Sequence, residues 1–161
     1  MSRKSTSPRP LDRTDRQILR HLQKDGRMSN AALARSVNLT ATPCLERVRR
    51  LERDGYIRGY TALLDPARVG AGLLVFVEID LLRTSPGAFR DFRREAQKLP
   101  ELLECHLVSG NFDYLLKARV RDMQEYRVLL GEKILALPGV SDSRSYVVME
   151  EVKESTVLPL I

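Results

Sequence analysis

The segment ERVRRLER, residues 46–53, places four arginines within eight residues. Guanidinium groups at this density are suited to binding phosphate, because each one offers several donors to an anion. On a helical wheel the apolar side chains of residues 41–51 gather around Val48, with Glu52 at the edge of their face. The polar positions lie on the opposite face and its two flanks: Pro43, Glu46, Arg47, Arg49, Arg50 and Arg53. A run of this kind is also typical of a solvated helix face, since Glu46 and Arg50 can pair one turn apart.

The elements around this segment favour binding over plain solvation. Apolar spacing predicts a first helix that begins at Asp12 or Asp15 and a second, short helix capped by Ser29 or Asn30. A third helix runs from the cap Thr40 to about Arg53. Three short helices with a tight turn between the last two match the helix-turn-helix arrangement.

A helix-turn-helix assigns different roles to the two ends of the third helix. Its N-terminal residues reach base edges in the major groove, and later basic residues reach phosphates. Thr40 leaves the first backbone N–H groups of the helix facing a phosphate. The expected base-edge residues are Thr42, Pro43, Glu46 and Arg47, and the expected phosphate contacts are Arg49, Arg50 and Arg53, with Arg47 able to serve either role.

Charge divides the chain into two modules. Residues 1–60 hold fourteen Lys/Arg against six Asp/Glu, a net charge of +8, whereas residues 61–161 carry a net charge of −2. We expect residues 1–10 to be a disordered basic arm and residues 11–64 to be the helix-turn-helix domain. Its last part, residues 56–64, is predicted to form one or two short strands as a wing or tether. A linker follows at 65–72, and the second domain spans 73–161.

The second domain alternates strands and helices. The pattern predicts a strand at 73–82, a helix at 86–100, strands at 102–110 and 114–120, a helix at 123–139 and a strand at 140–152. The order βαββαβ describes a ferredoxin-like sandwich, so the whole chain is α+β. Because LLVFVEIDLL is apolar on both sides, the sheet face without helices needs a cover. A second copy of the chain is the simplest cover, and we expect at least a dimer.

The turn between the two middle strands, SGNFDY, is the second place where chemistry is conceivable. Gly110 is expected to supply a backbone position that a side chain would obstruct, and Asp113 offers a carboxylate beside it. A plain hairpin turn explains the same residue types. Neither histidine and neither cysteine has a partner at catalytic or metal spacing, so we expect no enzyme, no metal and no cofactor. Without a membrane-spanning run or signal peptide, the expected location is the cytoplasm.

Several long blocks resemble the Lrp/AsnC family of transcription regulators. They are NLTATPCLERVRRLERDGYIRGYTALLDP, LLVFVEI, ECHLVSGNFDYLLKARV, LPGV and YVVMEEVK, and the likeness covers roughly residues 11–153. The resemblance implies a winged helix-turn-helix followed by an amino-acid-sensing domain that pairs into dimers, often assembled into octamers that wrap DNA. It places an amino-acid effector in a cleft between dimers. Because the lining of this cleft is apolar, the expected effector is leucine. Carried over to this sequence, the effector residues are Gly110, Phe112, Asp113, Tyr114, Met123, Tyr146, Val147 and Val148. The same resemblance implies an aspartate at the position of Asn111, which is a departure.

The expected function is therefore a DNA-binding regulator of amino-acid metabolism, associated with the nucleoid, whose assembly or DNA affinity responds to leucine. One alternative is an architectural protein that wraps double-stranded DNA with little sequence preference. Another is an amino-acid-binding regulatory subunit of an enzyme, because fold alone does not decide function. The +8 charge of the first module argues against the enzyme subunit.

Overall fold

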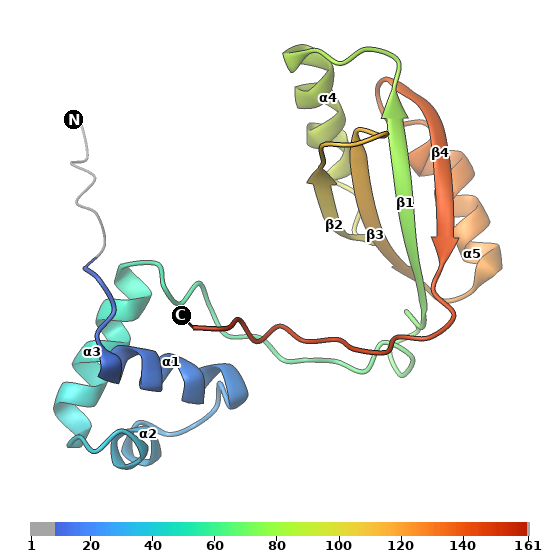
Figure 1. The fold of residues 1–161 in the computed structure, drawn as a ribbon. Helices are drawn as coiled ribbons and strands as arrows, with labels where there is room; N and C mark the ends of the chain where they lie inside the picture. The colour runs from blue at the N-terminus through green and yellow to red at the C-terminus, as the bar shows by residue number, and fades with distance from the viewer. Residues whose placement is uncertain (1–8, 161) are drawn as a thin grey trace. The chain divides into compact units, whose positions relative to one another are not determined.

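The computed structural model describes residues 9–160, so most of the expected basic arm lies outside the described residues (Figure 1). Internal contacts divide the chain into two units, residues 1–63 together with 153–161, and residues 64–152. Each unit has its own buried core.

The first unit consists of three helices, as expected. They are α1 (Arg13–Lys24), α2 (Asn30–Ser36) and α3 (Ala41–Arg53). Asp12 caps α1 in a reciprocal capping box with Asp15, and Ser29 caps α2. Thr40 occupies the N-cap position of α3, but its side chain makes no capping hydrogen bond among the described residues.

The inner face of α3 docks on the other two helices. Cys44 and Leu51 are fully buried and pack in one cluster with Ile18 of α1 and Leu33 of α2. Burial of this apolar stripe fixes the rotation of α3 about its axis, and therefore decides which of its polar residues face outward.

The predicted strands at 56–64 do not form. Residues 57–64 carry no secondary structure, and the described backbone bonds of this stretch include only that from the Ile57 N–H to the Leu51 carbonyl. A strand needs a hydrogen-bonded neighbour, and no described segment of this chain pairs with these residues.

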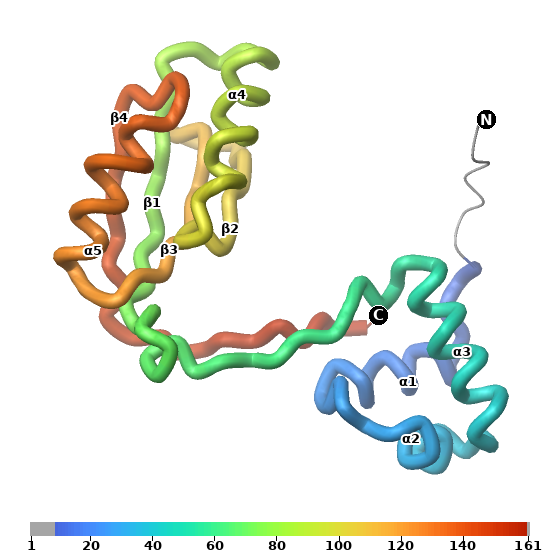
Figure 2. The backbone as a smooth tube through the Cα atoms, turned by 180° about the vertical axis from the view of Figure 1, so that it is seen from behind, coloured from blue at the N-terminus to red at the C-terminus, as the bar shows by residue number. Residues whose placement is uncertain are grey.

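The C-terminal segment was expected to belong to the second domain, but residues 153–160 contact the first unit. The Gln23 side chain makes two hydrogen bonds with the Leu158 backbone, at 3.1 and 2.7 Å. Leu160 packs against the helical core. Residues 57–63 and 153–160 run alongside one another in both views (Figures 1 and 2).

The second unit has the expected βαββαβ order. Its strands are β1 (Leu73–Leu81), β2 (Leu102–Leu107), β3 (Tyr114–Val120) and β4 (Val140–Val147). They form an antiparallel sheet in the order β2-β3-β1-β4. The helices α4 (Pro86–Ala96) and α5 (Met123–Val128) cover one face of this sheet (Figure 2).

The second helix of this unit was predicted to be one continuous helix over 123–139, but only its first part is α-helical. After α5 the chain continues as the π-helix η1 (Leu129–Ile134). The wider turn brings Leu129 and Ile134, five residues apart, onto the same buried side. The last strand also ends at Val147 rather than at residue 152.

The two faces of the sheet differ in chemistry. Alternate residues of β1, from Val75 to Leu81, join the core beneath the helices, and Tyr114 and Leu116 of β3 lie with them. The other face of β1 carries Leu74, Phe76, Glu78 and Asp80. The prediction that this strand is apolar on both sides was therefore wrong for its second half, where two acidic residues face away from the helices.

The docking of α3 can be tested by truncating a buried leucine. Leu51→Ala is expected to lower the free energy of unfolding by about 2–5 kcal/mol, because a cavity replaces packed atoms. Leu63→Ala is the matched control, since its side chain is 78% exposed and its truncation should cost less than about 0.5 kcal/mol. Urea unfolding followed by far-ultraviolet circular dichroism, at one protein concentration, measures both. Equal destabilisation by the two substitutions would contradict the assigned inner face of α3.

Candidate functional site

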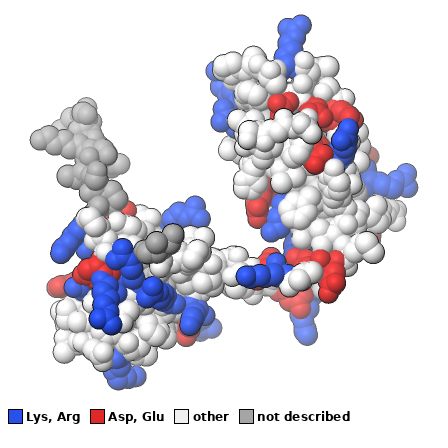
Figure 3. Space-filling view, viewed as in Figure 1, with Lys and Arg blue, Asp and Glu red and all other residues white. Residues whose placement is uncertain are grey.

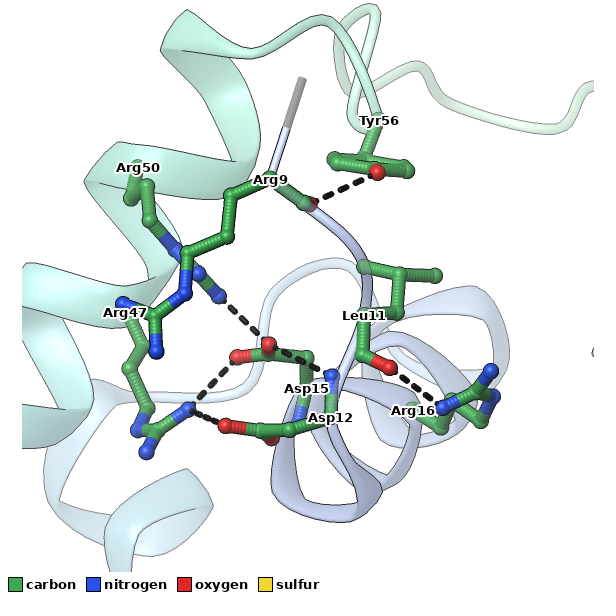
Figure 4. Close-up of polar contacts among 8 residues, drawn as sticks. All are labelled: Arg9, Leu11, Asp12, Asp15, Arg16, Arg47, Arg50 and Tyr56. Atoms are coloured by element: carbon green, nitrogen blue, oxygen red, sulfur yellow. Dashed lines mark hydrogen bonds and ion pairs between the residues drawn. The ribbon is translucent and has the colours of Figure 1, made fainter. Parts of the chain in front are cut away.

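Two of the four arginines in α3 turn toward α1. Arg47 donates from Nη1 to Asp12 Oδ2 at 2.6 Å and to Asp15 Oδ1 at 2.8 Å. Arg50 Nη2 lies 2.5 Å from Asp15 Oδ2. Figure 4 shows both guanidinium groups converging on the carboxylates at the start of α1. Arg50 was expected to contact a phosphate, but in this chain a buried acid already compensates its charge.

Asp15 is the centre of this group. Its side chain is fully buried, and the Asp12 N–H donates to its Oδ2 at 3.0 Å. Burial favours the neutral carboxyl, but the close contact with Arg50 and the hydrogen bonds from the Asp12 backbone and from Arg47 outweigh it and lower the pKa of Asp15. Asp15 therefore remains a carboxylate inside the domain.

Asp12 is more exposed but behaves in the same way. Burial again acts against the charge, while the Asp15 N–H and the Arg47 guanidinium lower the pKa of Asp12 from 3.8 to about 2. From the sequence, Asp12 and Asp15 were expected only to begin the first helix. The spacing of the two acids, three residues apart, is already explained by the capping box, so the sequence carried no separate signal for their contacts with α3.

The remaining predicted DNA contacts of α3 lie on its outer surface. They are exposed: Thr40, Thr42, Pro43, Glu46, Arg49 and Arg53. Arg49 and Arg53 form no ion pair with any described residue. The visible face of this unit carries many more Lys and Arg than Asp and Glu, whereas the second unit shows both signs (Figure 3).

A hollow of about 360 Å³ lies along this face of α3. Four arginines line it together with two other residues: Arg9, Pro43, Glu46, Arg47, Arg50 and Arg53. The Tyr56 hydroxyl donates to the Arg9 carbonyl at 2.9 Å, which holds the start of the described chain beside α3 (Figure 4). Arg47 and Arg50 are compensated by the two acids of α1, so Arg53 and Arg9, which have no ion pair among the described residues, are the arginines of this hollow that suit an anion such as a phosphate.

The turn between β2 and β3 is held by Asp113. Its carboxylate Oδ2 accepts the Leu81 N–H at 2.8 Å, and its own N–H donates to the Ile79 carbonyl at 2.9 Å. The first bond lies where the pairing of β1 with β4 shifts register between Asp80 and Leu81. Asp113 is thus a strand-end cap, and one carboxylate oxygen is already engaged.

Two other residues of this turn differ from expectation. The Tyr114 side chain is 1% exposed and stacks on Phe92 with ring centroids 4.3 Å apart, so it belongs to the core rather than to a cleft. A Cβ added to Gly110 would meet nothing within 4 Å, so no described atom obstructs a side chain there. The expectation that a side chain would be obstructed at this position is therefore not supported by the described residues.

The other effector candidates lie elsewhere on the sheet. Met123, Tyr146 and Val147 are 48%, 48% and 40% exposed, and Val148 is partly buried. The turn with Asp113 lies just before Tyr114, the first residue of β3, which pairs with Ile79 of β1. Met123 comes shortly after Val120, the last residue of β3, which pairs with Leu73. Six strand residues separate these points, which is about 20 Å. One chain therefore does not bring Asp113 and Met123 together.

Among residues 9–160, no three His, Cys, Asp or Glu side chains are placed to hold a metal ion. None of the described helices is long and apolar enough to cross a membrane.

A basic helix-turn-helix unit joined to a ferredoxin-like unit defines a two-domain DNA-binding regulator. The family model for the Lrp/AsnC ligand binding domain matches residues 74–158, and that for winged helix-turn-helix DNA-binding matches residues 11–58. The chain belongs to the Lrp/AsnC family, and it is a transcription regulator built on that family's α+β fold. The family and the fold class predicted from the sequence are both confirmed.

Named relatives agree with this assignment. The chain is 65% identical over 148 residues to the leucine-responsive regulatory protein of Escherichia coli strain K12, covering 92% of this chain and 90% of that protein. A transcriptional regulator from Neisseria meningitidis, solved as an L-Met complex, has a TM-score of 0.89 at 39% identity, covering 93% of this chain and 97% of the other. An AsnC family transcriptional regulator from Agrobacterium tumefaciens has a TM-score of 0.88 at 38% identity, covering 92% and 97%.

The lowered pKa of Asp12 predicts a defined acid sensitivity. A carboxyl whose pKa is lower in the folded state stabilises the fold above about pH 4, and this contribution disappears as the pH falls through about 2. In Asp12→Asn the amide still caps α1, but this acid-dependent part is absent. We expect the free energy of unfolding to fall less steeply between pH 4 and pH 2 in the variant, as measured by urea unfolding at each pH. Parallel curves for the two proteins would contradict the ion pair.

Proposed function

We propose that this protein is a leucine-responsive transcription regulator that reads DNA with the exposed face of α3. The observation that carries the leucine assignment is the 65% identity, over 92% of this chain, to a relative named for its response to leucine. The exposed, basic face of α3 supports the DNA contact.

On α3 we assign two sets of contacts. Thr42, Pro43, Glu46 and Arg47 lie in its first half and face base edges, the geometry of a helix-turn-helix in the major groove. Arg49 and Arg53, which are exposed and not ion-paired within the described chain, contact phosphates together with the N-terminal N–H groups beyond Thr40.

The effector site is proposed to need two chains. Gly110, Phe112 and Asp113 lie at one end of the sheet, while Met123 lies at the other, so a cleft containing both draws on two copies. Tyr146 and Val147 of β4, and Val148 directly after it, are proposed to line it. Leucine would present its carboxylate to backbone N–H groups of the turn and its ammonium to Asp113. Tyr114 has no place in this cleft because its ring is buried.

Assembly then provides the regulation. We propose dimers that associate further, with an octamer as the specific expectation. A ligand that binds between chains favours one assembly by the difference in its affinity for the two states. The number of helix-turn-helix units that meet one DNA changes with it, which alters avidity without any change in α3.

The leucine assignment is tested by thermal stability in the presence of each amino acid. Leucine at 100 times its dissociation constant should stabilise the protein by about 2.7 kcal/mol. Asp113→Asn keeps an acceptor for the Leu81 N–H but removes the charge, whereas Asp113→Ala removes both. We expect both variants to lose most of the leucine shift, and only the alanine variant to melt markedly lower without ligand. A full shift in Asp113→Asn would exclude the carboxylate as the ammonium ligand. A shift only with another amino acid, for example methionine, would overturn leucine.

The phosphate contacts are tested by the salt dependence of binding to a random-sequence duplex. Removal of one phosphate contact should reduce the slope of log affinity against log salt by about 0.9. Arg49→Gln and Arg53→Gln are each expected to reduce the slope by this amount for every helix-turn-helix unit that is bound to the DNA. Arg121→Gln, whose side chain is 71% exposed in the second unit, serves as the control and should leave the slope unchanged. Slopes unaffected in all three variants would remove Arg49 and Arg53 from the interface.

A further inference from the structure

Asp15 is a buried acid shared by two arginines of the proposed DNA-reading helix. Its side chain is 0% exposed, and it lies 2.8 Å from Arg47 Nη1 and 2.5 Å from Arg50 Nη2. With Asp12, which also binds Arg47, the group contains two acids and two bases. Its formal charge is therefore zero, although α3 presents four arginines in sequence.

The four arginines thus fall into two kinds. Arg49 and Arg53 are exposed and form no ion pair within the described chain. The side chain of Arg47 is 33% exposed and that of Arg50 only 18% exposed, and both are held against carboxylates. Arg50 Nη2 is buried and has no hydrogen bond of good geometry, so its short contact with Asp15 is purely an ion pair.

Compensated and free arginines differ in what they contribute to DNA binding. A free guanidinium releases a counterion from any phosphate that it meets, irrespective of sequence. A guanidinium held by a carboxylate has its remaining N–H donors fixed in orientation, and the pair as a whole carries no net charge. Held donors of this kind favour contacts that depend on geometry, as base edges require.

We propose that Asp15 is a positioning residue for DNA recognition, which holds Arg47 and Arg50 away from phosphates and so raises the ratio of specific to non-specific binding. This inference rests on the proposed contact of α3 with DNA. Asp15 itself touches no DNA in this arrangement, because it is buried behind the two arginines. Its effect is carried entirely by the guanidinium groups that it orients.

Neutralising Asp15 is the direct test. In Asp15→Asn the amide replaces the carboxylate at nearly the same size, and two guanidinium groups lose their shared counter-charge. We expect the salt slope on a random-sequence duplex to steepen by about 0.9 for each arginine released, and non-specific affinity at low salt to rise. The preference for an operator duplex, selected from a random pool with the unmodified protein, should fall at least about fivefold.

The matched control is Asp25→Asn. Asp25 ends the same helix, is exposed and has no guanidinium partner among the described residues, so its substitution removes the same charge from the same unit. Its slope and operator preference are expected to match those of the unmodified protein. A folded Asp15→Asn protein that behaves like Asp25→Asn would overturn the proposal, because the carboxylate would then be purely structural.

A second pair of variants tests the proposal even if Asp15→Asn fails to fold. Arg47→Gln should leave the random-sequence slope nearly unchanged while it lowers operator preference, whereas Arg53→Gln should reduce the slope by about 0.9. Equal reductions of the slope in the two variants would overturn the proposed division of roles. If the unmodified protein shows no salt-dependent binding to any duplex, the proposed function itself fails, whatever the Asp15 variants do.

Discussion

The contact of the Asp15 carboxylate with Arg47 and Arg50 is the interaction on which the first unit depends. A carboxylate with no solvent exposure is destabilising by several kcal/mol unless cations and N–H donors surround it. Here the partners come from α3, more than thirty residues later in the chain. The observed rotation of α3 satisfies this carboxylate and also buries Cys44 and Leu51. The polar and the apolar requirements therefore select the same set of outward-facing residues, which is the surface proposed to contact DNA.

Asp113 has a comparable role in the second unit. Its carboxylate accepts the Leu81 N–H at the point where β1 and β4 shift register, so the position of the turn depends on the end of the central strand. A group with this bond is already oriented before any ligand arrives. Orientation in advance reduces the conformational entropy lost on binding, and therefore leaves more of the interaction energy for affinity. The same bond means that truncating Asp113 disturbs the fold as well as any ligand contact.

Much of this fold could be predicted from the sequence because its signals are local. The caps Asp12 and Ser29, the apolar spacing in α3 and the alternation along β1 all act within a few residues. The errors concern contacts between distant segments. The burial of Tyr114 depends on the position of α4, and the pairing of Arg50 depends on α1. Residues 56–64 have the composition of a strand, but strand formation depends on a partner that composition does not reveal. Site residues are harder to predict than elements for this reason, since a side chain's role is set by its neighbours in space.

The effector candidates lie at two ends of one sheet, and under the proposed function this separation couples sensing to assembly. If a single chain held the complete pocket, leucine could bind without any effect on assembly. A pocket completed by a second chain makes ligand affinity and subunit affinity parts of one equilibrium, so each must change the other by the same factor. The sensor then needs no conformational path to α3, because the count of helix-turn-helix units on one DNA already carries the signal. A recognition helix held rigidly by a buried acid suits this arrangement, since its contacts stay constant while the number of copies in contact changes.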